Sequence, residues 1–210
     1  MTSSNKIVSL VRLTLPTLLV TLFTLPALAQ TNSAGDVIVR LRATELNWAN
    51  QQNNGLATTN VTAQNKAIPE VDVSYFFTKN IATELVLTYP QTVNINVGGA
   101  ASGTVKALPP TLLLQYHFTE LGQIKPYVGV GVNYTSFTSA NILNGGASVN
   151  ASSTGFAAQI GFDYMLDKNW GLNADLKYIQ IKTDVFAGGA NLGQLGLNPT
   201  VASAGLTYRF

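Results

Sequence analysis

Apolar and polar residues alternate along this chain of 210 residues, and this alternation limits its fold more than any single motif does. The segment 68–78 is typical, because Val71 and Val73 are separated by Asp72 and followed by Ser74. Successive side chains of a β-strand point to opposite faces, so a period of two predicts a strand with one apolar face. A helix would scatter the same residues around its axis.

Seven further segments alternate in the same way, so the sequence predicts eight strands. Together the eight cover residues 36–47, 68–78, 84–89, 108–118, 126–137, 154–166, 170–183 and 199–210. A tilted strand of about ten residues is long enough to cross the apolar core of a bilayer. Charged residues make up 10% of the chain, against about 25% in a typical soluble domain, which also predicts a surface that faces lipid.

The connections between these segments are short and long in turn. Residues 79–80, 119–125 and 167–169 form short turns, whereas the longer connections are residues 49–66, 92–106, 138–153 and 184–198. Short turns at one end and long loops at the other are the layout of outer-membrane barrels, with both termini on the periplasmic side. We therefore predict an all-β fold, an eight-stranded antiparallel up-and-down transmembrane β-barrel, surrounded by the lipids of a bacterial outer membrane.

The first 29 residues have the features of a secretory signal peptide. Lys6 and Arg12 precede an apolar stretch that ends in small residues at Ala29. A transmembrane anchor is the alternative, but two prolines and Arg12 leave little uninterrupted apolar length for a core of about 30 Å. We predict a signal peptide at residues 1–29, cleaved after Ala29, and an outer-membrane β-barrel domain at residues 30–210.

The composition of the predicted mature chain excludes several classes of function. Lys6 and Arg12 are two of the twelve basic residues, so ten basic and ten acidic residues remain, and nucleic-acid binding loses its support. The chain has no cysteine and one histidine, His117, so we predict no metal site and no cofactor. No serine can be placed beside His117, which falls near the periplasmic end. We therefore predict that the protein is not an enzyme.

The two faces of the predicted strands carry different residues. Nine aromatic residues of the apolar face fall at strand ends beside the short turns or the C-terminus, which predicts an aromatic girdle at one membrane interface. They are Tyr75, Phe77, Tyr116, Phe118, Phe162, Tyr164, Trp170, Tyr208 and Phe210. If the apolar face meets lipid, the opposite face lines the lumen.

The inward face supplies the candidate lumen lining. Its members are Arg40, Arg42, Glu70, Asp72, Glu84, Leu113, His117, Asp163, Asp175 and Lys177. Two interpretations stay open: the charges form a polar conduit, or they form a plug of ion pairs. The free-energy cost of an unpaired buried charge favours the plug, and His117 is interpreted as passive lining.

Several segments of the chain are more specific than a generic barrel. The first two are Leu108-Pro109-Pro110-Thr111-Leu112 and Lys125-Pro126-Tyr127-Val128-Gly129-Val130-Gly131-Val132-Asn133, and the third is the closing run Ser203-Ala204-Gly205-Leu206-Thr207-Tyr208-Arg209-Phe210. Together they resemble the OmpW family of outer-membrane proteins, which includes AlkL. The resemblance implies a narrow, partly hydrophobic channel that moves small apolar molecules inward and releases them sideways into the membrane. It also implies that Pro109, Pro110, Pro126, Tyr127, Gly129, Gly131 and Asn133 have an architectural role.

Two functions follow as hypotheses. The first is a channel for uptake of small hydrophobic molecules, supported by inward apolar residues such as Leu113. The second is a structural or surface-interaction barrel that acts through its long connections without transport.

The last strand adds a prediction about biogenesis. Gly205, Leu206, Tyr208 and Phe210 belong to a terminal pattern in which an aromatic residue follows apolar residues at every second place. This pattern resembles the signal that the outer-membrane barrel assembly machinery reads. We therefore expect that machinery to be a partner of the chain.

Overall fold

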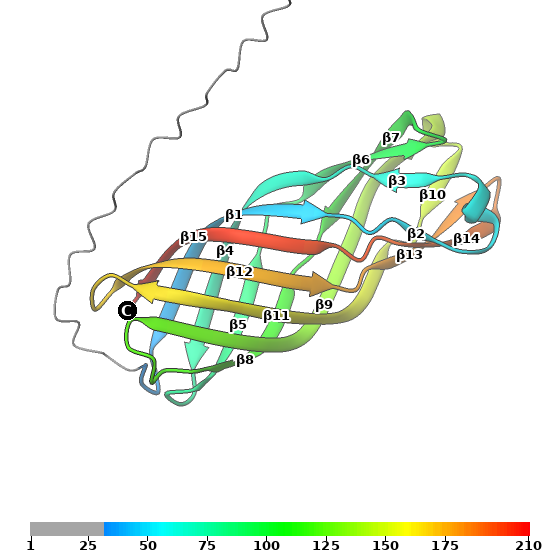
Figure 1. Cartoon of the computed structure of the whole chain (residues 1–210). Coiled ribbons are helices and arrows are strands. Elements are labelled where there is room, and N and C mark those ends of the chain that lie inside the picture. Colours follow the sequence, from blue (N-terminus) through cyan, green and yellow to red (C-terminus); the bar gives the residue numbers. More distant parts are fainter. Residues whose placement is uncertain (1–31) are drawn as a thin grey trace, which may run out of the picture.

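The barrel is built from eight antiparallel strands in the computed structural model, which describes residues 32–210 (Figure 1). In order around the barrel they are β1 (Val37–Asn47), β4 (Lys66–Phe76), β5 (Ile81–Leu87), β8 (Thr111–His117), β9 (Ile124–Ile142), β11 (Ser152–Met165), β12 (Trp170–Ile179) and β15 (Thr200–Arg209). Each strand corresponds to one of the eight segments that the alternation predicts. The predicted signal peptide and its cleavage site lie outside the described residues.

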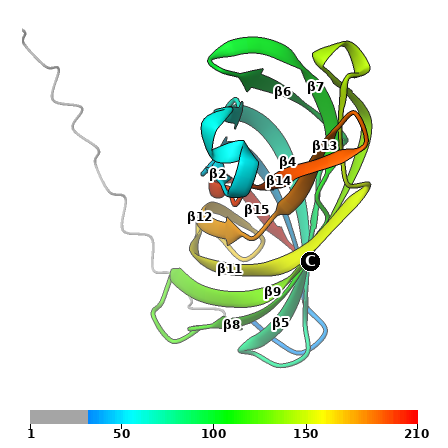
Figure 2. The same ribbon diagram turned by 90° about the vertical axis from the view of Figure 1, so that its right-hand side faces the viewer.

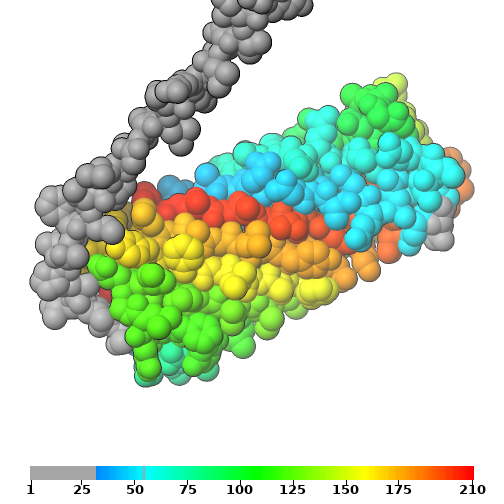
Figure 3. Space-filling view, viewed as in Figure 1, coloured from blue at the N-terminus to red at the C-terminus, as the bar shows by residue number. Residues whose placement is uncertain are grey.

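Pairing between the first and the last of these strands closes the barrel. β1 runs antiparallel to β15, from Ile38 opposite Arg209 to Asn47 opposite Thr200, and its other edge pairs with β4. β1, β15, β12 and β11 lie side by side as a continuous wall (Figure 3). Closure removes the exposed edges that a flat sheet would present. The predicted fold class is confirmed.

The sheet continues past the barrel at the end away from the C-terminus, and we call this part the extension (Figure 1). Its strands are β2 (Gln51–Gln52), β3 (Val61–Ala63), β6 (Gln91–Val97), β7 (Ala100–Leu108), β10 (Ala147–Val149), β13 (Lys182–Ala187), β14 (Ala190–Gly196) and the last part of β9, with the 3-10 helices η1 (Asn54–Thr58) and η2 (Leu143–Gly145). The prediction that the four long connections are loops is therefore wrong. They form strands because they also alternate, with Val93, Ile95 and Val105 buried inside the extension.

The sheet of the extension has two edge strands, and side-chain hydrogen bonds connect these two edges. The strand order is β3–β6–β7–β9–β10–β13–β14–β2, and η1 connects the edge strands β2 and β3 in sequence, next to β2 in Figure 2. The backbone N–H of Val61 donates to Oε1 of Gln52 at 2.8 Å, and that of Ala63 donates to Oδ1 of Asn50 at 2.8 Å. Amide side chains thus take the place of a backbone ladder between these two edges.

The outer surface of the barrel suits a lipid environment. Aliphatic side chains such as Leu41 and Val130 are 57% and 66% exposed on the middle of the wall. Aromatic rings pair edge to face at the end that carries the short turns and the C-terminus, which we call the turn end; Tyr208, for example, contacts Trp170 and Phe210 with centroid distances of 4.7 Å. Outward aromatic residues also occur toward the other strand ends: Tyr89, Tyr134, Phe156 and Tyr178. No helix within residues 32–210 is long and apolar enough to cross a membrane.

Candidate functional site

Arg40 of β1 lies at the centre of a buried network in the barrel lumen. Its Nε and Nη2 donate to the two carboxylate oxygens of Asp163 at 3.0 and 2.7 Å. Its Nη1 donates to Glu84 at 2.9 Å and to Ser74 at 2.8 Å, and the guanidinium lies over the ring of Tyr127, 5.1 Å from the centroid. A planar guanidinium has donors in the fixed geometry that a carboxylate accepts, so this pair orients both side chains.

Arg42 lies two residues further along β1, on the same face, and extends the network. Its Nε donates to Glu70 at 3.0 Å, and its Nη2 pairs with Asp72 at 2.5 Å. Nζ of Lys177 pairs with Asp175 at 2.6 Å and with the same oxygen of Glu70 at 3.1 Å. Glu70 therefore connects a cation of β1 to a cation of β12.

Neutral amides supply further hydrogen bonds to the carboxylates. Nε2 of Gln159 donates to Glu84 at 2.9 Å and to Asp175 at 2.8 Å, and Nε2 of Gln115 donates to Glu84 at 2.8 Å. Oε1 of Gln115 lies 3.0 Å from Nε2 of His117. Charges removed from water are tolerated only when ion pairs and hydrogen bonds replace hydration. The two amides supply such hydrogen bonds to Glu84 and Asp175, whereas the carboxylate of Asp72 is compensated by its ion pair with Arg42.

Two glycines let the strands hold these side chains close together. A Cβ on Gly205, which lies opposite Arg42 in the β1–β15 ladder, would collide with the carbonyl oxygen of Leu41. A Cβ on Gly161 would lie 2.5 Å from the hydroxyl of Tyr127, its partner in the β9–β11 ladder. Both positions therefore exclude any larger residue unless the neighbouring strand or ring moves.

The charged network, defined here by its eight ionisable residues, has more acidic than basic residues. Its three cations are Arg40, Arg42 and Lys177, and its five carboxylates are Glu70, Asp72, Glu84, Asp163 and Asp175. None of the eight is more than 6% exposed. Eight strands leave a lumen just wide enough for side chains, so these groups fill it. The inward charges thus pair with one another, as the plug interpretation requires.

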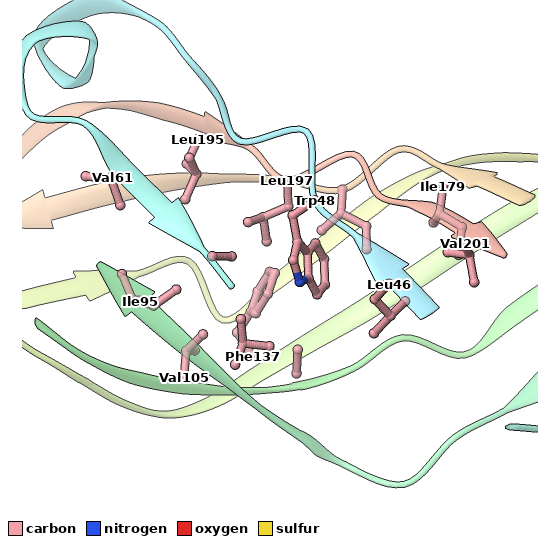
Figure 4. Packing of buried hydrophobic residues seen from close by; sticks show 14 of the residues in the cluster. Leu46, Trp48, Val61, Ile95, Val105, Phe137, Ile179, Leu195, Leu197 and Val201 are labelled. Atoms are coloured by element: carbon pink, nitrogen blue, oxygen red, sulfur yellow. The ribbon is translucent and has the colours of Figure 1, made fainter. Parts of the chain in front are cut away.

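The interior toward the extension is apolar, and we call it the apolar compartment (Figure 4). Buried side chains that form it include Leu46, Trp48, Leu56, Val61, Ile95, Val105, Phe137, Ile142, Val185, Leu195 and Leu197. The compartment contains a cavity of about 90 Å³, lined mainly by aliphatic side chains and Phe137. Apolar cavities stay dry and can take up apolar guests, so this space suits a small hydrophobic molecule.

The wall has an interruption, the β4–β6 seam, where β4 passes the base of the extension. The β4–β5 ladder begins at Val71 opposite Leu87, and β6 pairs with β3 and β7. Within the described chain, residues 66–70 of β4 pair with β1 on one edge and with no strand on the other. Nζ of Lys66 reaches across and donates to the carbonyl oxygen of Thr92 at 3.2 Å. Prolines lack the N–H that a ladder needs, and four lie in the strand and links around the seam: Pro69, Pro90, Pro109 and Pro110.

The structure places all ten predicted lining residues inside the barrel. Eight of them form the charged network, and Leu113 lies in the apolar cluster with Val86. His117 lies toward the turn end between two rings, with centroid distances of 4.7 Å to Phe76 and 5.0 Å to Tyr127. That these residues line a transport path stays a prediction.

Two parts of the site are not evident from the sequence alone. Gln115 and Gln159 fall on the inward face but nothing in the sequence singles them out, because their importance comes from the carboxylates that surround them. Ile95, Val105 and Leu195 fall in segments that read as loops. The alternation in those segments was the available signal, although it is shorter and interrupted by glycines.

The family of the chain follows from its sequence together with this fold. The sequence profile of the OmpW family matches residues 33–210. The chain belongs to the OmpW family. It is 42% identical over 164 residues to an uncharacterised outer-membrane protein, y4mB, of Sinorhizobium fredii, covering 75% of this chain and 72% of that protein. It is 35% identical over 154 residues to outer membrane protein W of Vibrio cholerae, with coverages of 66% and 71%.

Solved structures agree with this assignment. The crystal structure of the outer membrane protein OprG from Pseudomonas aeruginosa matches with a TM-score of 0.72 and 27% identity, over 86% of this chain and 98% of that one. As an OmpW-family member, the protein is a β-barrel of the bacterial outer membrane, which confirms the predicted family and location. In this layout the turn end faces the periplasm and the extension faces the cell exterior.

Proposed function

We propose that this OmpW-family barrel is a passive channel, and not an enzyme, for uptake of small hydrophobic molecules. The observation that carries the proposal is the change of interior along the barrel axis, from the apolar compartment at the exterior to the charged network in the barrel. Burial of apolar surface is favourable by about 25 cal/mol per Å², so the compartment attracts a hydrophobic molecule. The charged network excludes this molecule, because separating the buried ion pairs to make room for it has a large free-energy cost.

The β4–β6 seam supports a sideways route out of the compartment. A molecule that enters from the exterior meets the charged network and cannot follow the axis to the periplasm. The seam is bridged by the side chain of Lys66 and not by a backbone ladder along residues 66–70. Moving one flexible side chain requires less free energy than breaking several ladder hydrogen bonds. Release through this seam delivers the molecule to the apolar core of the bilayer.

Uptake of an apolar fluorescent tracer by proteoliposomes tests the proposal. Ala147 lines the cavity, so Ala147→Phe fills the space, and we expect uptake to fall toward the rate of protein-free vesicles. Ala202 lies on the lipid-facing side of β15, so Ala202→Phe adds the same volume outside the barrel and is the matched control. Equal uptake with and without the wild-type protein would overturn the proposal.

The second hypothesis, a structural or surface-interaction barrel, is favoured by one observation. The extension is a folded β-structure and so presents a defined surface to the exterior. Shortening the β13–β14 hairpin at its tip, Gly188–Gly189, tests it. Loss of adhesion or stress survival with unchanged tracer uptake would support this function over the channel.

A further inference from the structure

Trp48 carries a hydrogen-bond donor that has no partner in the apolar compartment. The residue follows β1 and is 9% exposed, and no residue within 32–210 accepts a hydrogen bond from its indole Nε1. Figure 4 shows the indole among Phe137, Leu197 and Leu46. A buried donor without an acceptor destabilises the fold, so a residue of this kind indicates a role that a phenylalanine or leucine would not fulfil.

A second unmet group belongs to Gln91, two strands away from Phe137. Gln91, at the start of β6, is 1% exposed; its Nε2 donates to the carbonyl oxygen of Tyr89 at 2.9 Å, whereas its Oε1 has no hydrogen-bond partner in the described chain. Gln91 lies opposite Ala107, and Ala107 lies opposite Phe137, which belongs to the same cluster as Trp48. The indole donor of Trp48 and the amide acceptor of Gln91 are therefore both left unmet.

Residues next to these two groups belong to the cavity and to the β4–β6 seam. Phe137 and Leu197 line the cavity and also surround Trp48. The backbone N–H of Trp48 belongs to no strand ladder. It donates to Oδ1 of Asn65, the residue before Lys66 of the seam. The residue after Gln91 is Thr92, to which Lys66 donates. Both unmet groups therefore have the cavity-lining residue Phe137 in their cluster or ladder on one side and a residue of the seam next to them on the other.

We propose that Trp48 binds an oxygen acceptor on the ligand, so that the channel favours apolar molecules with one oxygen group, such as ketones, esters or alcohols, over plain hydrocarbons. This inference rests on the proposed channel function and names its ligand class. The Trp48 indole N–H donates to the ligand oxygen, while the hydrocarbon part occupies the apolar compartment.

Fluorescence in lipid vesicles tests the inference directly, because the chain has two tryptophans. The other, Trp170, is 49% exposed on the outer wall, so Trp170→Phe leaves Trp48 as the single reporter. The probes are 2-nonanone and nonane, with binding corrected for partition into protein-free vesicles. We expect the ketone to shift the Trp48 emission to longer wavelength and to bind about two- to tenfold more tightly than nonane, the range that one neutral hydrogen bond supplies.

The variant Trp48→Phe, with displacement of a fluorescent apolar dye as the readout, gives the second measurement. We expect the ratio of ketone to nonane affinity to fall to about one while nonane binding persists, since the ring is kept and the donor is removed. An unchanged ratio in Trp48→Phe, or no ketone-specific shift with Trp48 present, would overturn the inference and leave the channel function standing. Failure of both probes to bind the wild-type protein would overturn the channel function itself.

Discussion

Arg40 and Asp163 are 123 residues apart in the sequence, yet two hydrogen bonds of 3.0 and 2.7 Å join them across the barrel lumen. β1 and β11, which carry them, are separated by β15 and β12 around the wall. The pair therefore connects strands that share no backbone hydrogen bonds. Such links fix the distance between opposite walls of the barrel and also fill its lumen.

Removing one partner of this pair should destabilise the barrel. In Arg40→Met, the carboxylates of Asp163 and Glu84 lose their cation in a buried setting, and loss of one partner of a buried pair costs about 3–5 kcal/mol. The free energy of unfolding in urea, with the protein in lipid vesicles, measures the effect. Lys79→Ala is the control, because its pair with Glu120 is exposed and worth at most about 1 kcal/mol. A change in Arg40→Met no larger than in the control would contradict the prediction.

The charged network should make the wild-type barrel almost impermeable to ions. We expect little conductance in planar bilayers, because side chains fill the lumen. The double variant Arg42→Ser with Lys177→Ser removes two of the three cations of the network. We expect the remaining carboxylates to repel one another and to let water and cations into the lumen. Lys182→Ser removes an exposed lysine of β13 and is the matched control. A high wild-type conductance, equal to that of the double variant, would show that the charges line a conduit.

Locking the β4–β6 seam should block uptake reversibly. The chain has no cysteine, so Lys66→Cys with Thr92→Cys introduces the only two thiols. A short bifunctional thiosulfonate reagent then joins the two strands, and reductant releases them. We expect tracer uptake to fall on cross-linking and to recover on reduction, since Lys66 and Thr92 lie on opposite sides of the seam and the Lys66 side chain spans it to the Thr92 carbonyl. Tracer uptake that stays unchanged on cross-linking would exclude release through the β4–β6 seam.

Deleting Phe210 should impair assembly more than ligand passage. The residue is 71% exposed and its ring contacts Tyr208, so it adds little to the interior. The folded fraction in cells, read as heat-modifiable gel mobility, should fall, while the protein that does fold keeps its tracer uptake. Phe118→Ala removes another aromatic residue of the turn end and serves as the control. Normal folding without Phe210 would show that this residue is not part of the assembly signal.

The sequence predicts whether a side chain points into the barrel or outward, but it does not predict which residues that side chain contacts. Alternation places Arg40, Glu84 and Asp163 on inward faces, because the direction of a side chain along a strand is a local property with a period of two. Gln115 and Gln159 share that face, but their role depends on carboxylates contributed by strands far away in sequence. No local pattern contains that information.

The extension shows the limit of local patterns most clearly. Residues such as Ile95 and Leu195 alternate too briefly, between glycines, to indicate strands, and only pairing with β7 and β13 makes them part of one sheet. The sequence by itself determined the eight strands, the lipid-facing surface and the inward charges, since these depend on neighbours along the chain. The tertiary structure decided the ion pairs, the apolar compartment and the β4–β6 seam, because barrel closure and register bring together residues that no local period relates.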